Sequence, residues 1–172
     1  SPNVEIKNYP NKNNLYNILA ATACITSFVN IKKLKKGIFL NINIPKGRGN
    51  IFDVNFENKK IYFVDESYNS NPLSLKSSIE NFEKLVLKKS KKYMFLGDML
   101  ELGKDEKTEH AALLDLALNE EVDILFLLGE RTKDLTSAAI SCTHFNSKED
   151  LLAVLKDEVK PGDAVLVKGS RG

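Results

Sequence analysis

One short stretch of the sequence gathers side chains that could bind a nucleotide. Asp65-Glu66-Ser67-Tyr68-Asn69 follows an apolar run, and Asn71-Pro72 comes directly afterwards, with one serine between them. A carboxylate can accept hydrogen bonds from ribose hydroxyls, a tyrosine ring packs against a flat base, and an asparagine pairs with amide or carboxylate groups. The alternative is an ordinary turn, because Asn, Ser and Pro favour turns and helix caps.

Two further segments carry cations among glycines. Gly47-Arg48-Gly49 could present an arginine to a phosphate, or it could be a hinge with a solvated side chain. Lys168-Gly169-Ser170-Arg171-Gly172 offers two cations and a hydroxyl. This composition suits an anionic ligand, because arginine binds carboxylate and phosphate through two parallel hydrogen bonds. A ragged chain end is the alternative for this segment.

The elements that would position these segments alternate between strands and helices. Apolar runs predict strands at 51–56, 60–64, 93–96, 123–128, 143–145 and 164–167. Helical periodicity and capping residues predict helices at 14–30, from Pro72 with Asn71 as its cap, at 106–119, at 131–140 and at 147–155. Glu57-Asn58-Lys59 fits a hairpin turn. The pattern predicts an α/β fold, with a Rossmann-like, mostly parallel sheet that has helices on both faces.

The same periodicity predicts which helical side chains are buried. In the helix that starts at Pro72, the expected stripe is Leu75, Ile79, Phe82 and Val86. In the helix at 106–119, the expected inward residues are Ala111, Leu114 and Leu118.

A parallel sheet would bring the polar segments together. The carboxyl ends of parallel strands meet at one edge of the sheet, and ligands bind beyond that edge. Four predicted strands end in polar or small residues: Asp65–Asn69, Gly97-Asp98, Gly129-Glu130 and Lys168–Arg171. The sequence therefore predicts one binding rim.

Composition narrows the class of protein. The 172 residues are 42% hydrophobic and 28% charged, with a net charge of +2, which argues against nucleic-acid and membrane partners. The polar segment Ser1–Lys12 lacks the apolar core of a signal peptide. Cys24 and Cys142 lie in apolar stretches without metal-ligand spacing, which predicts buried free thiols and a cytoplasmic location.

Several kinds of chemistry lack their usual motifs. The chain contains neither a G-x-G-x-x-G dinucleotide motif nor a G-x-x-x-x-G-K-[ST] phosphate loop. His110 and His144 have no metal-type spacing and are expected to be structural, and no serine lies in a nucleophile elbow. We therefore expect no metal site here and assign no catalytic residue. Another segment would have to hold the phosphates of a nucleotide.

Five segments, in this order, resemble the Mur ligase family. Residues 13–21 resemble its [HN]-N-x-x-N-x-x-A-A helix, and Arg48 resembles the arginine at a domain junction. Residues 65–72 resemble the D-[DE]-[ST]-Y-N-A-N-P signature of one member of the family. Residues 97–103 and 167–172 are similar to further segments of that member. The resemblance covers nearly the whole chain.

The resemblance implies an activity. The member with that signature is an ATP- and Mg²⁺-dependent amide ligase of peptidoglycan precursor synthesis. It phosphorylates the carboxyl group of UDP-N-acetylmuramoyl-tripeptide, and the amine of D-alanyl-D-alanine then attacks the acyl phosphate. Its cofactors would be ATP and Mg²⁺, and the protein would be a monomer. Residues 1–46 resemble the end of the central ATP-binding domain and residues 47–172 resemble the C-terminal domain. We therefore expect a fragment that is inactive alone, with the metal ligands upstream.

The resemblance also implies site residues. Seven would bind ATP: Asn14, Asn17, Arg48, Asp65, Glu66, Tyr68 and Asn69. Four would bind substrate: Asn71, Lys168, Ser170 and Arg171. The last three of these would face the dipeptide or the acyl phosphate. Asn14 and Asn17 would lie near the adenine. One of Asp65 and Glu66 would meet the ribose, and the resemblance favours Glu66. Relatives often have Asp at that position, so the choice between the two acids stays open. Asn13 stands where relatives often have His, so it receives no proton-transfer role.

Two alternatives remain at this level. One is another Mur ligase or a folylpolyglutamate synthase-type ligase domain, which would carry different residues at Tyr68–Pro72. The other is a non-catalytic, flavodoxin-like binding module, which would show no nucleotide-dependent behaviour.

Overall fold

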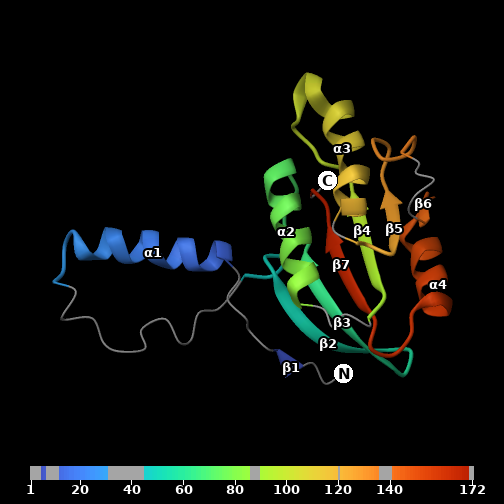
Figure 1. The fold of residues 1–172 in the computed structure, drawn as a ribbon, viewed down its shortest axis with the longest axis horizontal. Helices are drawn as coiled ribbons and strands as arrows, with labels where there is room; N and C mark the ends of the chain where they lie inside the picture. Colours follow the sequence, from blue (N-terminus) through green and yellow to red (C-terminus); the bar gives the residue numbers. More distant parts are fainter. Residues whose placement is uncertain are drawn as a thin grey trace.

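Figure 1 shows the computed structural model of the chain, which describes residues 5–6, 12–30, 45–85, 90–119, 121–135 and 141–170. Its strands are β1 (Glu5–Ile6), β2 (Asn50–Phe56), β3 (Lys59–Glu66), β4 (Lys92–Gly97), β5 (Ile124–Leu128), β6 (Ser141–Phe145) and β7 (Ala164–Lys168). Its helices are α1 (Lys12–Thr26), α2 (Pro72–Leu85), the short 3₁₀ helix η2 (Gly103–Asp105), α3 (Glu106–Asn119) and α4 (Lys148–Glu158).

The described strands form one mixed sheet. Their order is β1-β2-β3-β7-β4-β5-β6. Neighbouring strands from β3 to β6 pair in parallel, whereas β2 pairs antiparallel with β3, and β1 with β2. The predicted mostly parallel sheet is confirmed.

Helices cover both faces of this sheet. Met94 and Leu96 pack in the same core cluster as the buried residues of α2 and α3. Tyr93 and Phe95 pack instead with the buried residues of α4. Successive side chains of a strand point to opposite faces, so β4 is buried on both sides. A strand that is buried on both faces has a continuous run of apolar residues, and this run predicted the strand from the sequence.

A two-residue turn joins β2 to β3. Glu57 and Asn58 have φ values of 49° and 63°, and the strands pair in register on either side of them. Positive φ at both central positions matches the right-handed twist of the hairpin. The predicted hairpin is confirmed.

Side-chain caps start α2 and α4. The Ser74 backbone N–H donates to Asn71 Oδ1 at 2.8 Å, which satisfies one of the unpaired N–H groups of the first turn of α2. Ser147 Oγ accepts from the Asp150 N–H at 3.1 Å at the start of α4. Both predicted caps are confirmed. The predicted stripe of α2 is confirmed for its buried residues Leu75, Ile79 and Phe82, whereas Val86 lies outside the described residues.

The predicted helix at 131–140 is wrong where it is described. Residues 131–135 form bends and a turn, and 136–140 lie outside the described residues. The Arg131 N–H donates to Asp98 Oδ1 at 3.1 Å, and Thr132 Oγ donates to the Gly129 carbonyl at 3.1 Å. These bonds hold the chain in a turn after β5.

The predicted inward face of α3 is partly wrong. Ala111 is exposed, whereas His110, Leu113 and Ala117 are buried. The His110 ring is held inside the fold, because Nε2 accepts from the Met99 N–H at 3.0 Å and Nδ1 lies 2.7 Å from the Glu106 carbonyl. The buried face therefore starts one position earlier than expected. The predicted residues Leu114 and Leu118 are partly buried against the core.

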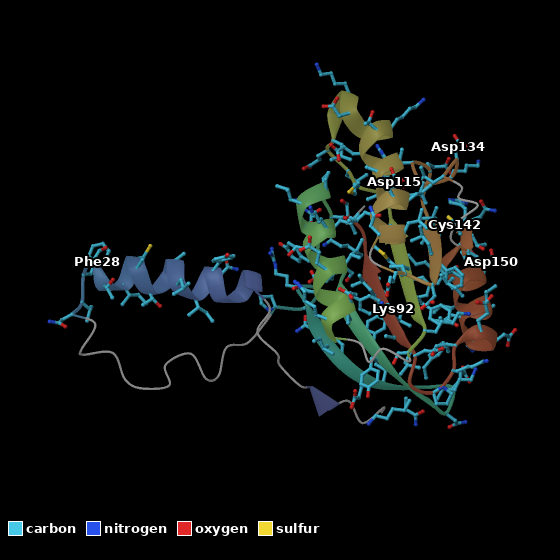
Figure 2. The ribbon with its side chains drawn as sticks, viewed as in Figure 1. Phe28, Lys92, Asp115, Asp134, Cys142 and Asp150 are labelled. Carbon is cyan, nitrogen blue, oxygen red and sulfur yellow. The ribbon has the colours of Figure 1, made fainter. Side chains whose placement is uncertain are left out.

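The helix α1 differs from the helices of the sheet domain. It ends at Thr26, and residues 27–30 continue as turns and bends. Figure 1 shows it set apart from the sheet, and Figure 2 places Phe28 at its far end, with 89% of its surface exposed. Cys24 is exposed, so the prediction of a buried thiol is wrong there, whereas Cys142 is half-buried and burial raises its thiol pKa. A search of the described helices finds none long and apolar enough to cross a membrane.

Candidate functional site

The strand ends meet at one edge of the sheet, as predicted. Glu66 at the end of β3 pairs with Lys168 at the end of β7. Lys168 in turn pairs with Leu96 of β4, and Gly97 pairs with Leu128 of β5. The polar segments after these strands therefore lie side by side and form a rim.

Two glycines fold the segment before β2 onto this rim. Gly47 and Gly49 have φ values of 78° and 84°, which side chains with a Cβ rarely adopt. The Tyr68 N–H donates to the Gly47 carbonyl at 3.0 Å, and the Gly49 N–H donates to the Asp65 carbonyl at 2.9 Å. The guanidinium carbon of Arg48 then lies 3.9 Å from the centroid of the Tyr68 ring. The fold thus presents an exposed cation stacked on an exposed aromatic ring.

The two neighbouring acids have different surroundings. Asp65 Oδ1 accepts hydrogen bonds from the Ser67 N–H at 3.1 Å and from Ser67 Oγ at 2.6 Å, so this carboxylate stabilises the turn after β3. Glu66 lies 3.9 Å from Lys168 Nζ, with 17% of its side chain exposed. Burial raises the pKa of Glu66, and the nearby charges of Lys168 and Arg48 oppose this shift only in part. Glu66 is therefore the acid that is less engaged by its own turn.

Lys168 lies beneath the loop that follows β3. Only 2% of its side chain is exposed, and its Nζ donates to the Asn69 carbonyl at 3.0 Å. Burial lowers the pKa of Lys168, and the Glu66 carboxylate opposes this shift. Burial thus disfavours the charged form of both Glu66 and Lys168. The sequence placed this lysine on the rim, but its charge is directed into the protein.

Ser170 joins three loops. Its Oγ donates to the Ser70 carbonyl at 3.1 Å and accepts from the Leu100 N–H at 3.1 Å. Its own N–H donates to the Asp98 carbonyl at 2.9 Å. The loops after β3, β4 and β7 are therefore one bonded unit.

The remaining predicted site residues lie in several places. Asn69 Oδ1 accepts from the Ser70 N–H at 2.8 Å, and Asn71 caps α2. Asn17 is exposed on α1, which Figure 1 shows apart from the sheet. Asn14 lies in the same helix, but its side chain is outside the described residues, as is Arg171.

Sequence reasoning missed a charged cluster on the same rim. Arg131 Nε lies 2.6 Å from Glu106 Oε2, and its Nη1 lies 3.6 Å from Asp98 Oδ2. The hydrogen bond to Glu106 is the main cause that raises the pKa of Arg131. The Asp98 carboxylate packs against Gly129, whose φ is 130°, and leaves no room for a Cβ there. The sequence places Gly97-Asp98 and Gly129-Glu130 on the rim, but it predicts that Arg131 starts a helix, so the cluster is missed.

A shallow cavity of about 420 Å³ lies beyond the ends of β5 and β6. It is lined by Leu128, Gly129, Glu130, His144, Phe145, Asn146, Ser147 and Lys148. His144 is tied to its wall, because Nε2 lies 2.8 Å from the Gly129 carbonyl. The contact of His144 with Gly129 agrees with the structural role predicted for it. The contacts of His110 with Met99 and Glu106 agree with the same prediction for His110.

Comparison with known families identifies the class of this protein. The sequence profile described as "Mur ligase, glutamate ligase domain" matches residues 47–171. This match covers more than half of the chain, so the chain belongs to the Mur ligase family. The resemblance found in the sequence is confirmed at the level of the family.

Individual relatives carry a more specific name. The UDP-N-acetylmuramoyl-tripeptide–D-alanyl-D-alanine ligase of Bacillus subtilis is 33% identical over 115 residues, which are 63% of this chain and 25% of that protein. The protein of the same name from Rickettsia prowazekii is 31% identical over 135 residues, 77% of this chain and 29% of that protein. The chain therefore spans less than a third of the length of these two relatives.

Solved structures share the fold. The MurF ligase of Thermotoga maritima in complex with ADP has a TM-score of 0.72 and 27% identity, over 96% of this chain and 36% of that one. MurF from Acinetobacter baumannii has a TM-score of 0.70 at 24% identity, which supports the fold alone.

Metal binding can be tested against the described side chains. Within the part of the chain that the structure describes, no group of three His, Cys, Asp or Glu residues is placed to hold a metal ion.

Proposed function

We propose that this chain is part of an ATP-dependent amide ligase that joins D-alanyl-D-alanine to UDP-N-acetylmuramoyl-tripeptide in the cytoplasm. Residues 1–46 would belong to the central ATP-binding domain and residues 47–172 to the C-terminal domain. The 172 residues alone would not ligate, Mg²⁺ would be held by the upstream sequence, and the protein would act as a monomer. The names of the relatives support this proposal. The observation that carries it is the stacked Arg48–Tyr68 pair beside Glu66.

Each of these three side chains suits one part of ATP. Arg48 is an exposed cation that can form paired hydrogen bonds with phosphate oxygens. Glu66 can accept a hydrogen bond from a ribose hydroxyl. Ser67 donates to the Asp65 carboxylate, but within the described structure no such hydrogen bond engages the Glu66 carboxylate. Tyr68 supplies an aromatic surface at the same place. We therefore infer that Glu66 binds the ribose hydroxyl, whereas Asp65 stabilises the turn after β3.

The remaining ATP contacts would come from elsewhere. Asn69 would shape the loop beside the ribose, and Asn14 and Asn17 would approach the adenine once the upstream domain places α1. Arg171 would face the incoming dipeptide, and Asn71 would fix the loop through its cap of α2.

The reaction needs positioning more than acid–base catalysis from this domain. A carboxylate oxygen of the tripeptide attacks the γ-phosphorus of ATP, and ADP leaves. The dipeptide amine then attacks the acyl carbon, phosphate leaves, and the nitrogen loses a proton. Residues of the rim would hold the nucleotide in line with the carboxylate and place positive charge near the phosphates.

The test is a ligase assay on the full-length protein. With ATP, Mg²⁺, the UDP-tripeptide and D-alanyl-D-alanine, it should form the pentapeptide product and ADP, whereas the 172-residue chain should form none. Arg48→Ala should raise the KM for ATP by roughly 10- to 100-fold, as expected when a charged hydrogen bond is lost. The matched control is Lys156→Ala, a half-exposed lysine on α4. Absence of product from the intact protein would refute the proposal.

A further inference from the structure

The loop after β3 is held down from β7. We define the rim loop as residues 67–71, between the end of β3 and the start of α2. We infer that Lys168 and Ser170 are positioning residues, which fasten the rim loop to β7 so that Glu66 and Tyr68 meet the nucleotide, and that neither side chain contacts the dipeptide. This inference rests on the proposed function for its consequences on ATP binding, whereas the fastening itself follows from the contacts.

The burial of Lys168 carries the first step. A lysine that received a dipeptide carboxylate would keep its ammonium accessible, but 2% of this side chain is exposed. A buried charge is tolerated only when polar partners surround it. Its partners are the Asn69 carbonyl at 3.0 Å and the Glu66 carboxylate at 3.9 Å. The Lys168 ammonium therefore holds the Asn69 carbonyl in place and faces Glu66, the acid that we propose binds the ribose.

The bonding of Ser170 carries the second step. A serine hydroxyl has one proton to donate, and this one donates it to the Ser70 carbonyl at 3.1 Å. The same oxygen accepts from the Leu100 N–H at 3.1 Å. The hydroxyl is thus committed to the loops after β3 and β4.

The spacing of the two residues explains why they act together. Residues two apart along an extended chain point to the same side, so Lys168 and Ser170 both reach toward the rim loop. They bind the consecutive carbonyls of Asn69 and Ser70. Gly169 between them packs closely on β4, where an added Cβ would lie 3.1 Å from the Gly97 Cα. The end of β7 therefore acts as a two-point anchor for the rim loop.

The anchor predicts a specific kinetic pattern in the full-length protein. Lys168→Met should raise the KM for ATP about tenfold, because the loop that carries the nucleotide contacts loses a charged hydrogen bond. The KM for D-alanyl-D-alanine should stay within about twofold of wild type. If Lys168 contacted the dipeptide directly, Lys168→Met would raise the KM for D-alanyl-D-alanine and leave the KM for ATP nearly unchanged. That result would overturn the inference.

Hydrogen exchange tests the anchor without relying on activity. In Lys168→Met and Ser170→Ala, peptides that cover residues 67–71 should exchange faster, while peptides of β5 should not change. The matched control is Lys92→Met, since Lys92 is also a buried lysine with a loose ion pair, at 4.0 Å to Glu121, at the other end of the sheet (Figure 2). It should leave the rim loop and both KM values unchanged.

The remaining outcomes separate the two proposals. If wild-type protein makes no product, the proposed function fails, and exchange of residues 67–71 still decides the anchor. Unchanged exchange in both Lys168→Met and Ser170→Ala overturns the anchor even in an active ligase. If Lys168→Met does not fold, Ser170→Ala alone tests the anchor, and Ser170→Thr is its conservative counterpart. Ser170→Thr retains a hydroxyl and should retain protection of the loop, which a loss of protection would contradict.

Discussion

The two ends of the parallel sheet use charged side chains differently. At the amino end, carboxylates accept hydrogen bonds from backbone N–H groups. Asp163 accepts from Lys91 at 3.2 Å and from Lys160 at 2.8 Å, and Asp123 accepts from Lys92 at 2.7 Å. These short bonds hold the turns that lead into β4 and β7. The carboxylates of this end are thus hydrogen-bonded to the backbone within the fold.

At the carboxyl end, a buried pair of opposite charges lies beside an exposed cation. Glu66 and Lys168 face each other at 3.9 Å, and burial acts against the charged state of both. Arg48 stacks on Tyr68 but is exposed to solvent. Perturbed ionisable groups are known to cluster at functional sites. The difference suggests that one end serves stability and the other serves binding.

Asp163→Ala tests the amino end and should have the largest effect. It removes the acceptor of two hydrogen bonds at a side chain that is 7% exposed, so the free energy of unfolding should fall by about 3 kcal/mol. Urea unfolding followed by circular dichroism measures this change. Asp123→Ala removes the acceptor of one hydrogen bond, from the Lys92 N–H, and should lower the free energy of unfolding by about half as much. A raised KM for ATP without loss of stability would contradict the proposed division between the two ends.

Gly47→Ala tests the carboxyl end. A Cβ at Gly47 would lie 2.7 Å from the Tyr68 nitrogen, and the residue has a φ of 78°. We expect a loss of about 2 kcal/mol in unfolding free energy and a severalfold higher KM for ATP, because Arg48 and Tyr68 would separate. Gly162→Ala is the matched control at the amino end, since its φ is 89° but no atom lies within 4 Å of the added Cβ. Gly162→Ala should lower the free energy of unfolding by only about 1 kcal/mol and leave the KM for ATP unchanged. Equal KM effects of both variants would show that the contact with Tyr68 is irrelevant.

Much of the scaffold could be predicted from local sequence. Continuous apolar runs marked the buried strands, Asn71-Pro72 and Ser147 marked helix starts, and the alternation of strands and helices placed the polar segments on one rim. These signals depend on residues near one another in the chain. They are therefore readable without tertiary contacts.

The chemistry of individual rim residues could not be predicted in this way. Asp65 and Glu66 are neighbours in the sequence, but in a strand they point to opposite faces, so one meets Ser67 and the other meets Lys168. The turn at Arg131 depends on Asp98, 33 residues earlier in the chain. Such distinctions depend on register and on packing between distant segments.

Tyr93→Phe gives a pH-dependent test of the amino end. The Tyr93 hydroxyl donates to the Glu158 carbonyl at 3.1 Å, and burial, as the main cause, raises its pKa from 10.0 to about 12. Between these values the folded state retains a proton that the unfolded state has lost, so stability should fall as the pH rises from 10 toward 12. Tyr93→Phe should lose about 1 kcal/mol at neutral pH and show a flatter decline above pH 10. Urea midpoints measured at several pH values test this, and equal slopes for both proteins would contradict the assignment.

Ser70→Ala should change the free energy of unfolding in the opposite direction, because the carboxyl end contains a buried hydroxyl without a hydrogen-bond partner among the described residues. Ser70 is 3% exposed, and within the described residues its Oγ has no hydrogen-bond partner. Alanine also occupies this position in the D-[DE]-[ST]-Y-N-A-N-P signature that the segment resembles. Removing a buried hydroxyl that lacks a partner should raise the unfolding free energy by about 1 kcal/mol, with no loss of the carbonyl bond to Ser170.

The matched control for this last variant is Ser78→Ala. Ser78 is 5% exposed, but its Oγ donates to the Ser74 carbonyl at 2.8 Å. The lost hydrogen bond should offset the gain in helix propensity, so the control should change little. If Ser70→Ala instead destabilises the protein, or raises the KM for ATP, then the hydroxyl has a partner in the full-length protein. The rim loop would then contribute a direct contact of its own, in addition to the loop position that Lys168 and Ser170 maintain.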